Sequence, residues 1–351
     1  MRIVLLLLVA VVHVGAAGCG EQSEPAVDGA PPPAAETSIY VTLVGHLEDS
    51  PQYANCDRYP MVRARLMEFM DLIQEAEVPF NLQVEYEFFL GASRCETEAL
   101  MATTGGLNIL DYLATERGIE IDAHQEGAWE APMSDTPDNY ADIRYLGAQV
   151  TSRISENVGG ILWDNAEQFA RLRDGEIGLL HPAFTWLPDV LTMAVSQQHH
   201  EGDFTIDDRT SGVWRPSGAG ESFWADNPAA RMVYIGPGQH HSSWGPRACY
   251  FNHAFEYAEV LLRYVDEGRL AAGRMYTATQ AFPQSVMLDA TRHDEVRSIL
   301  AAGAPLVTSG QVRLQTYSEV AASWRADFAS EPSVVRFEQI EASDYTCDRT
   351  P

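Results

Sequence analysis

Residues 118–127 (GIEIDAHQEG) carry three side chains that can bind a metal ion or transfer a proton. Asp122, His124 and Glu126 stand at alternate positions after an alternating run typical of a strand. Alternate strand positions share one face, so His124 and Glu126 can reach the same ion. Asp122 lies one step deeper on that face, where it would orient an imidazole by a hydrogen bond.

A second segment ends in the same way. Residues 39–49 (IYVTLVGHLED) begin with an apolar run and finish with His46, Glu48 and Asp49. His240 likewise comes after an apolar run, residues 232–235, from which residues 236–239 (GPGQ) separate it. In α/β proteins the carboxyl ends of parallel strands meet at one edge, where functional sites are found. The sequence therefore predicts one site assembled from several strand ends.

The residue types at these ends favour a metal-assisted hydrolytic site. The predicted ligands are His46 and His124, with Glu126 or Glu48 completing the set, because two imidazoles and a carboxylate are a common catalytic Zn²⁺ set. Bound Zn²⁺ lowers the pKa of its water to about 7. A nearby carboxylate would then act as acid or base. We expect Asp49 in that role.

Three further residues complete the candidate site. Glu48 is an alternative catalytic carboxylate, His240 would contact the substrate or an oxyanion, and Asp164 would support the metal ligands. Asp164 follows a short apolar run at residues 159–163. A different chemistry remains open. Glu48, Glu126 and Asp164 could instead supply the paired carboxylates of a metal-independent glycosidase.

The elements that must position these residues alternate between strand and helix, which predicts an α/β fold with a parallel sheet. Helical periodicity recurs between the strands, and residues 175–220 read as long loops with a small inserted β-element. A (β/α) barrel of seven or eight units, with long loops at the carboxyl ends of its strands, fits the length best. The expected strands are residues 39–44, 80–90, 119–124, 159–163, 232–235, 275–278 and 312–315.

The N-terminus reads as a targeting segment ahead of one domain. Residues 1–18 hold an apolar run too short to span a membrane, typical of an export signal. Small residues then lead into Cys19, as in the cleavage box of bacterial lipoproteins, which predicts lipidation of Cys19; ordinary secretion with a disulfide-bonded Cys19 is the alternative. Residues 19–37 read as a disordered tether. Residues 38–351 then form the barrel, anchored to the membrane and facing the periplasm or cell surface.

Four cysteines remain in the domain. In an exported protein an even number indicates two disulfides. We expect Cys56–Cys95, because both cysteines lie in loops after the first two strands. Cys249–Cys347 would then hold the C-terminal tail. Four buried free thiols are the alternative. No C-x-x-C spacing of a structural zinc site occurs.

Composition excludes several classes of function. The formal charge of the 351 residues is −27, which argues against binding to nucleic acid. The chain contains no lysine, so Schiff-base and phosphate-loop lysines are excluded. No dinucleotide-binding glycine motif and no Gly-x-Ser-x-Gly elbow occur. Tryptophans in predicted loops could stack on sugars or simply pack in the core: Trp129, Trp186, Trp214, Trp224 and Trp244.

The order of these motifs resembles the polysaccharide-deacetylase and glycoside-hydrolase/deacetylase barrels. That family has an Asp-Asp pair after its first strand and a His-x-x-x-His motif on its third. Here the corresponding segments are residues 46–49 (HLED) and residues 122–126 (DAHQE). Asp49 and His124 carry over most directly. The resemblance implies a seven-unit barrel in which a divalent metal and a carboxylate base remove acetyl groups from amino-sugar polymers.

Three hypotheses follow. The leading one is a cell-envelope lipoprotein that acts on carbohydrate by metal-assisted, deacetylase-like hydrolysis. The second is the metal-independent glycosidase with paired carboxylates. The third is a non-catalytic carbohydrate-binding or scaffold lipoprotein on the same barrel.

Overall fold

The structure is a computed structural model that describes residues 37–48, 50–125, 139–196, 209–241 and 252–344. These residues belong to one unit, Glu36–Pro351. Within the described ranges, no helix combines the length and the apolar character needed to cross a membrane.

Strand β1 (Ile39–Leu47) lies inside the sheet, and all nine of its residues are buried. Such burial on both faces is typical of a strand in a parallel sheet. One edge of β1 pairs in parallel with β11 (Tyr276–Phe282). The other edge of β1 pairs with β2 (Asn81–Val84) near the carboxyl end of β1. Near its amino end, β1 pairs on that second edge with β12 (Val312–Leu314).

The parallel strands form a nearly closed ring. The order of pairing is β11–β1–β2–β3–β4–β7–β9, and the chain continues from β9 through residues 236–238 into β10, which pairs with β11. The α/β barrel expected from the sequence is therefore confirmed. β8 (Val213–Trp214) adds an antiparallel edge to β9. The remaining ring strands are β3 (Glu120–His124), β4 (Ile154–Leu162), β7 (Val190–Val195), β9 (Val233–Ile235) and β10 (Gln239–His241).

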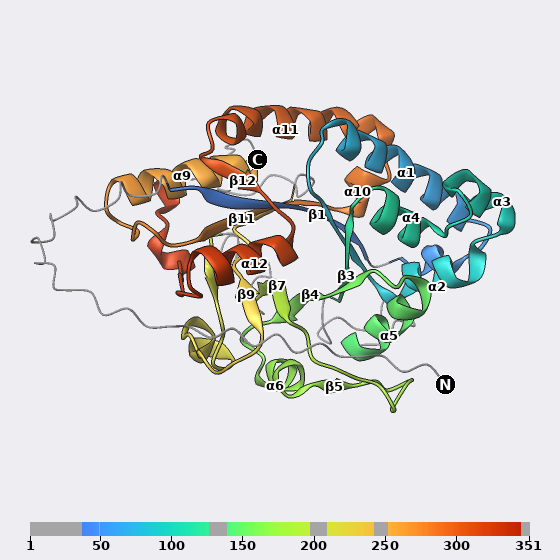
Figure 1. Cartoon of the computed structure of the whole chain (residues 1–351), viewed down its shortest axis with the longest axis horizontal. Coiled ribbons are helices and arrows are strands. Elements are labelled where there is room, and N and C mark those ends of the chain that lie inside the picture. Colours follow the sequence, from blue (N-terminus) through green and yellow to red (C-terminus); the bar gives the residue numbers. More distant parts are fainter. Residues whose placement is uncertain (1–36, 49, 126–138, 197–208, 242–251, 345–351) are drawn as a thin grey trace, which may run out of the picture. The chain divides into compact units, whose positions relative to one another are not determined.

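Helices cover the outside of the ring. Figure 1 shows α1 and α11 above β1 and β11, and α5 and α6 below β4. β5 (Glu176–Ile177) and β6 (Thr185–Trp186) form a separate hairpin. The helices are α1 (Tyr59–Glu75), α2 (Tyr86–Cys95), α3 (Glu98–Met101), α4 (Ile109–Glu116), α5 (Tyr140–Val150), α6 (Ala166–Asp174), α9 (Ala254–Asp266), α10 (Gln284–Met287), α11 (His293–Thr308) and α12 (Tyr317–Asp327).

Side chains of β1 alternate between two packed regions. Val41 and Leu43 belong to the main core under the outer helices. Tyr40 and Val44 pack in a second cluster that includes Trp324 of α12. The backbone N–H of Tyr317, the first residue of α12, donates to Oδ1 of Asn81 at the start of β2 (3.2 Å). Helix α12 therefore covers the amino-terminal end of the barrel, and the opposite end carries the predicted site.

The strand expected over residues 80–90 is shorter than predicted. β2 ends at Val84, and α2 starts at Tyr86. Phe88, Phe89, Ala92 and Cys95 are buried at helical spacing, so this apolar run covers one face of a helix. A short aromatic run fits a strand or a helix equally well, and packing decides between them.

The loop region expected over residues 175–220 contains a barrel strand. All six residues of β7 (VLTMAV) are buried, and β7 fills the place between β4 and β9. The segment at residues 312–315 was expected to be a barrel strand. In the structure β12 instead pairs with β1 outside the ring.

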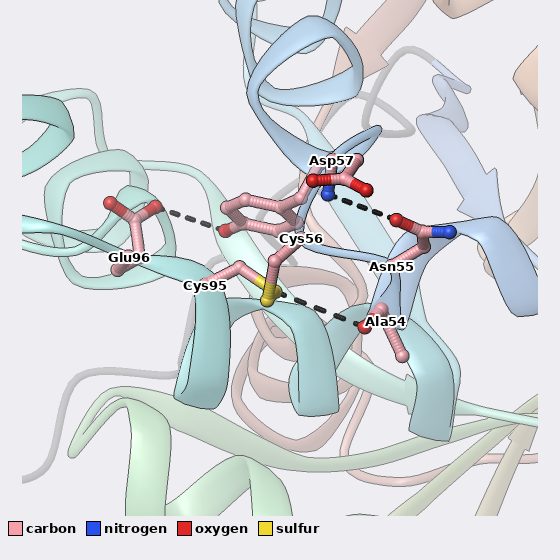
Figure 2. The surroundings of a disulfide bond; sticks show 7 residues. Ala54, Asn55, Cys56, Asp57, Cys95 and Glu96 are labelled. Carbon is pink, nitrogen blue, oxygen red and sulfur yellow. Dashed lines mark hydrogen bonds between the residues drawn. A yellow bond between two sulfur atoms is a disulfide. The ribbon is translucent and has the colours of Figure 1, made fainter.

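The predicted disulfide Cys56–Cys95 is present and joins the loop after β1 to the end of α2. Figure 2 shows the bridge with Glu96 next to Cys95. The hydroxyl of Tyr59 donates to Oε1 of Glu96 (2.9 Å). Nε of Arg63 donates to the same carboxylate (2.9 Å). Cys19, Cys249 and Cys347 lie outside the described residues, so the lipidation site and the second disulfide remain predictions.

Candidate metal centre

Three side chains meet at the carboxyl ends of β1 and β3. His46 is the second-last residue of β1, Glu48 follows that strand directly, and His124 ends β3. Oε2 of Glu48 lies 2.8 Å from Nε2 of His124 and 3.4 Å from Nδ1 of His46. The two imidazole rings stack with their centroids 4.6 Å apart. Together they form the His46–Glu48–His124 group.

The strands bring this group together although β2 lies between β1 and β3. His46 pairs in register with Gln83 of β2, and Gln83 pairs with Asp122 of β3. His124 lies two residues beyond Asp122, so it points to the same side of β3 one step nearer the carboxyl end. The two imidazoles thus approach each other over the top of β2.

The group is almost fully enclosed: exposure is 3% for His46, 8% for Glu48 and 3% for His124. Burial by itself would raise the pKa of Glu48, but the two neighbouring imidazoles outweigh it and hold that pKa well below its usual range. Burial and the neighbouring His46 lower the pKa of His124, although Glu48 opposes them. Glu48 is therefore an anion at neutral pH.

An ionised carboxylate only accepts hydrogen bonds, so Nε2 of His124 carries the hydrogen that it shares with Glu48. The other ring nitrogen of His124, Nδ1, is buried and has no hydrogen-bond partner within the described ranges. The imidazole is thus held firmly on one side only.

The donor set fits a divalent cation. One ligand atom from each member of the group lies within 4.8 Å of the others. Two imidazoles and a carboxylate are a common set for a hydrolytic Zn²⁺ site. A cation would replace the hydrogens that the imidazoles now direct at Glu48, which is the usual exchange on metal binding. Of the two carboxylates that the sequence offers as the third ligand, Glu48 lies with the two histidines. Glu126 lies outside the described residues.

Asp122 does not contact an imidazole. Its carboxylate accepts hydrogen bonds from Nδ2 of Asn81 (2.7 Å), Nδ2 of Asn157 (3.3 Å) and the hydroxyl of Ser155. Burial, together with the charge of Glu120, raises the pKa of Asp122 to about 8. The alternating positions on β3 place Asp122 deeper in the barrel, where these amides are nearer than His124. Asp122 therefore supports the barrel interior and not the metal ligands.

Of the other predicted residues, two are described by the structure and two are not. Asp164 is exposed on the turn after β4 and is not a member of the His46–Glu48–His124 group. The backbone of His240 lies in β10 and pairs with Gln280 of β11. Asp49 and Glu126 lie outside the described residues, so their predicted roles stay predictions.

The described tryptophans pack in the core and offer no open ring face to a sugar. Trp186 and Trp214 are buried, and Trp224 contacts Trp163 edge to face. Packing, the alternative to sugar stacking, is therefore the role that the structure supports for these side chains. Trp129 and Trp244 lie outside the described ranges.

No protein-family model and no curated protein sequence matches the chain. Among solved structures, it is similar to a putative polysaccharide deacetylase from Mycobacterium smegmatis, with 12% identity, a TM-score of 0.42 and coverage of 88% of this chain and 96% of that one. A probable polysaccharide deacetylase from Pseudomonas aeruginosa gives 11% identity and a TM-score of 0.45, covering 84% and 94%.

The 4-alpha-glucanotransferase from Thermococcus litoralis gives 10% identity and a TM-score of 0.41, covering 81% of this chain. The match spans only 38% of the length of that enzyme. Identities and TM-scores at this level do not transfer a reaction or a substrate from those proteins to this chain.

Proposed function

We propose that the protein is a metal-assisted hydrolase that removes acetyl groups from carbohydrate. The observation that carries this proposal is the His46–Glu48–His124 group at the carboxyl-terminal end of a (β/α) barrel. His46, His124 and Glu48 would hold the cation. When bound there, a divalent cation would polarise the carbonyl of the substrate and lower the pKa of its bound water.

The side chains of the group contribute in different ways. Glu48 brings a buried negative charge that favours a cation, and the two imidazoles supply neutral nitrogen ligands. Enclosure by the barrel strengthens these interactions, because charges attract more strongly where water is excluded. Helix α12 covers the amino-terminal end, so a substrate would approach from the carboxyl ends of the strands.

The substrate class follows from the resemblance of residues 46–49 and 122–126 to the deacetylase motifs. An acetylated amino sugar presents a carbonyl to the metal centre and a nitrogen as leaving group. We further propose that the protein acts in the cell envelope, attached through Cys19.

A screen for acetate release tests this function. The full chain is loaded with Zn²⁺ or Co²⁺ and incubated with acetylated amino-sugar oligomers and with O-acetylated polysaccharides. We expect release of acetate that stops when a chelator is added and is absent in a His124→Ala variant. Release that continues without metal, or cleavage of glycosidic bonds instead, would contradict the proposal and favour a glycosidase.

A further inference from the structure

Glu85 stands at the carboxyl end of β2, between the two strands that carry the His46–Glu48–His124 group. Although β2 ends at Val84, the backbone N–H of Glu85 still donates to the carbonyl of Leu47 on β1 (3.1 Å). Its backbone is extended, with φ −86° and ψ 173°. Glu85 therefore keeps the alternation of the strand for one further residue.

The preceding residues of β2 show which way Glu85 faces. Nδ2 of Asn81 donates to Asp122 (2.7 Å), and Nε2 of Gln83 donates to Oγ1 of Thr192 across the barrel (3.0 Å). Both side chains point into the barrel interior. Glu85 is the next residue on that face by the alternation of the strand, and it is 5% exposed.

The strand register places Glu85 beside the group. Val84 pairs with Leu47 on one side and with Ala123 on the other. One residue further along, Glu85 stands between Glu48 and His124, at the spacing of about 5 Å between neighbouring strands. Its carboxylate is not one of the ligand atoms that lie within 4.8 Å of one another, so it does not belong to the His46–Glu48–His124 group.

We propose that Glu85 is the second carboxylate of this metal centre, facing the bound cation and its water without being a ligand. The role of Glu85 in hydrolysis rests on the proposed function, whereas its role in metal binding does not. A second ionised carboxylate at this edge would strengthen the attraction for a dication, because both charges act on the same cation. A residue in this position strengthens metal binding through charge and hydrogen bonds.

In hydrolysis, Glu85 would take one proton from the attacking water, in the role that the sequence analysis expects for Asp49. The water oxygen bonds to the acetyl carbon, and the carbonyl electron pair moves onto its oxygen. When that pair returns and the C–N bond breaks, the Glu85 carboxyl gives the proton to the leaving nitrogen. The products are acetic acid and an amine, and Glu85 is again a carboxylate.

The test compares Glu85→Gln with Glu87→Gln in the full chain. Glu87 is also buried, but it belongs to the first turn of α2 and lies outside the row formed by Glu48, Glu85 and His124. Zn²⁺ affinity is measured by competition with a chromophoric chelator, and folding is checked by thermal unfolding. We expect Glu85→Gln to bind Zn²⁺ roughly 10- to 100-fold more weakly, and Glu87→Gln to bind it like the wild type.

Turnover provides a second measurement where the wild type releases acetate. Glu85→Gln should lower kcat by roughly 10²- to 10⁴-fold at saturating metal, with little change in KM. A Glu85→Asp variant keeps the charge and should fall between Glu85→Gln and wild type in Zn²⁺ affinity. It also serves if Glu85→Gln fails to fold.

The outcomes separate this inference from the function on which it rests. Wild-type Zn²⁺ affinity in Glu85→Gln, or an equal loss in Glu87→Gln, overturns the role of Glu85. If the wild type binds Zn²⁺ but releases no acetate, the proposed function fails, and the affinity series still decides about Glu85. If the wild type binds no divalent cation, the metal centre and the role of Glu85 are both rejected.

Discussion

Glu48 combines burial with a full negative charge. Burying an ion is costly unless strong partners surround it, and here two imidazole nitrogens point at one of its carboxylate oxygens. A divalent cation would stabilise the buried carboxylate of Glu48 in the same way, with a larger charge. The side chain is thus suited to a metal ligand, in keeping with the geometry of the group.

At the residue scale, the sequence identifies the two histidines and leaves the carboxylate open between Glu48 and Glu126. His46 and Glu48 have the same alternate spacing as His124 and Glu126, so spacing cannot separate the two choices. Glu85 is absent from the predicted site although it alternates with Asn81 and Gln83. The polar face of this strand could have pointed to Glu85 as a site residue. The apolar face, with Leu82 and Val84, is the stronger pattern and indicates only a strand.

Gly160 fixes the backbone beside His124 and gives a test of that packing. Its φ is +83°, and a Cβ there would lie 1.9 Å from the carbonyl oxygen of Gln125. We expect Gly160→Ala to lower the free energy of unfolding by about 3 kcal/mol or more, through left-handed strain and overpacking together.

Gly105→Ala is the matched control for Gly160→Ala. Gly105 has a φ of +68°, and a Cβ added there would meet no heavy atom within 4 Å. The substitution should cost only the left-handed strain, about 1 to 2 kcal/mol. Urea unfolding measures both variants. Equal losses at the two glycines would show that Gly160 is not confined by Gln125.

At the element scale, the strands that end in histidine are the most predictable. Their apolar alternation and polar ends are local signals, and both strands occur where expected. β7 is missing from the prediction because its six residues lie in a region rich in Gly, Pro and Trp, a composition typical of loops. A fully buried strand has no alternation to reveal it.

The disulfide between the loop after β1 and the end of α2 should stabilise the domain. Cys56 and Cys95 are 39 residues apart in the sequence, so the bridge closes a sizeable loop in the unfolded chain. We expect a Cys56→Ser/Cys95→Ser variant to lose about 2 to 4 kcal/mol of unfolding free energy. Guanidinium unfolding of the oxidised wild type and the variant measures this. Identical midpoints would mean that the bridge adds no stability.

At the scale of the whole molecule, the alternation of strand and helix is enough to predict a barrel. It does not predict which strands belong to that barrel. The expected strand at residues 312–315 pairs with β1 outside the ring, and β7 takes a place in it. Pairing between strands far apart in sequence depends on packing that no local pattern contains. The charge of −27 fits an acidic surface and is compatible with a buried cation site.

The proposed membrane attachment depends on one residue of the N-terminal segment. If Cys19 is lipidated, the full chain should fractionate with membranes, and Cys19→Ser should release it to the soluble exported fraction. Mass spectrometry of the mature N-terminus checks the modification directly. A wild-type protein that is soluble and unmodified at Cys19 would favour ordinary secretion.

The metal content of the purified protein tests the central claim most directly. The full chain, isolated in oxidised form and analysed by elemental mass spectrometry, should carry close to one equivalent of Zn, Co or Ni. A His124→Ala variant that stays folded should carry almost none. A folded wild-type protein that remains free of metal after incubation with each of these ions would contradict the assignment of His46, Glu48 and His124 as a metal centre.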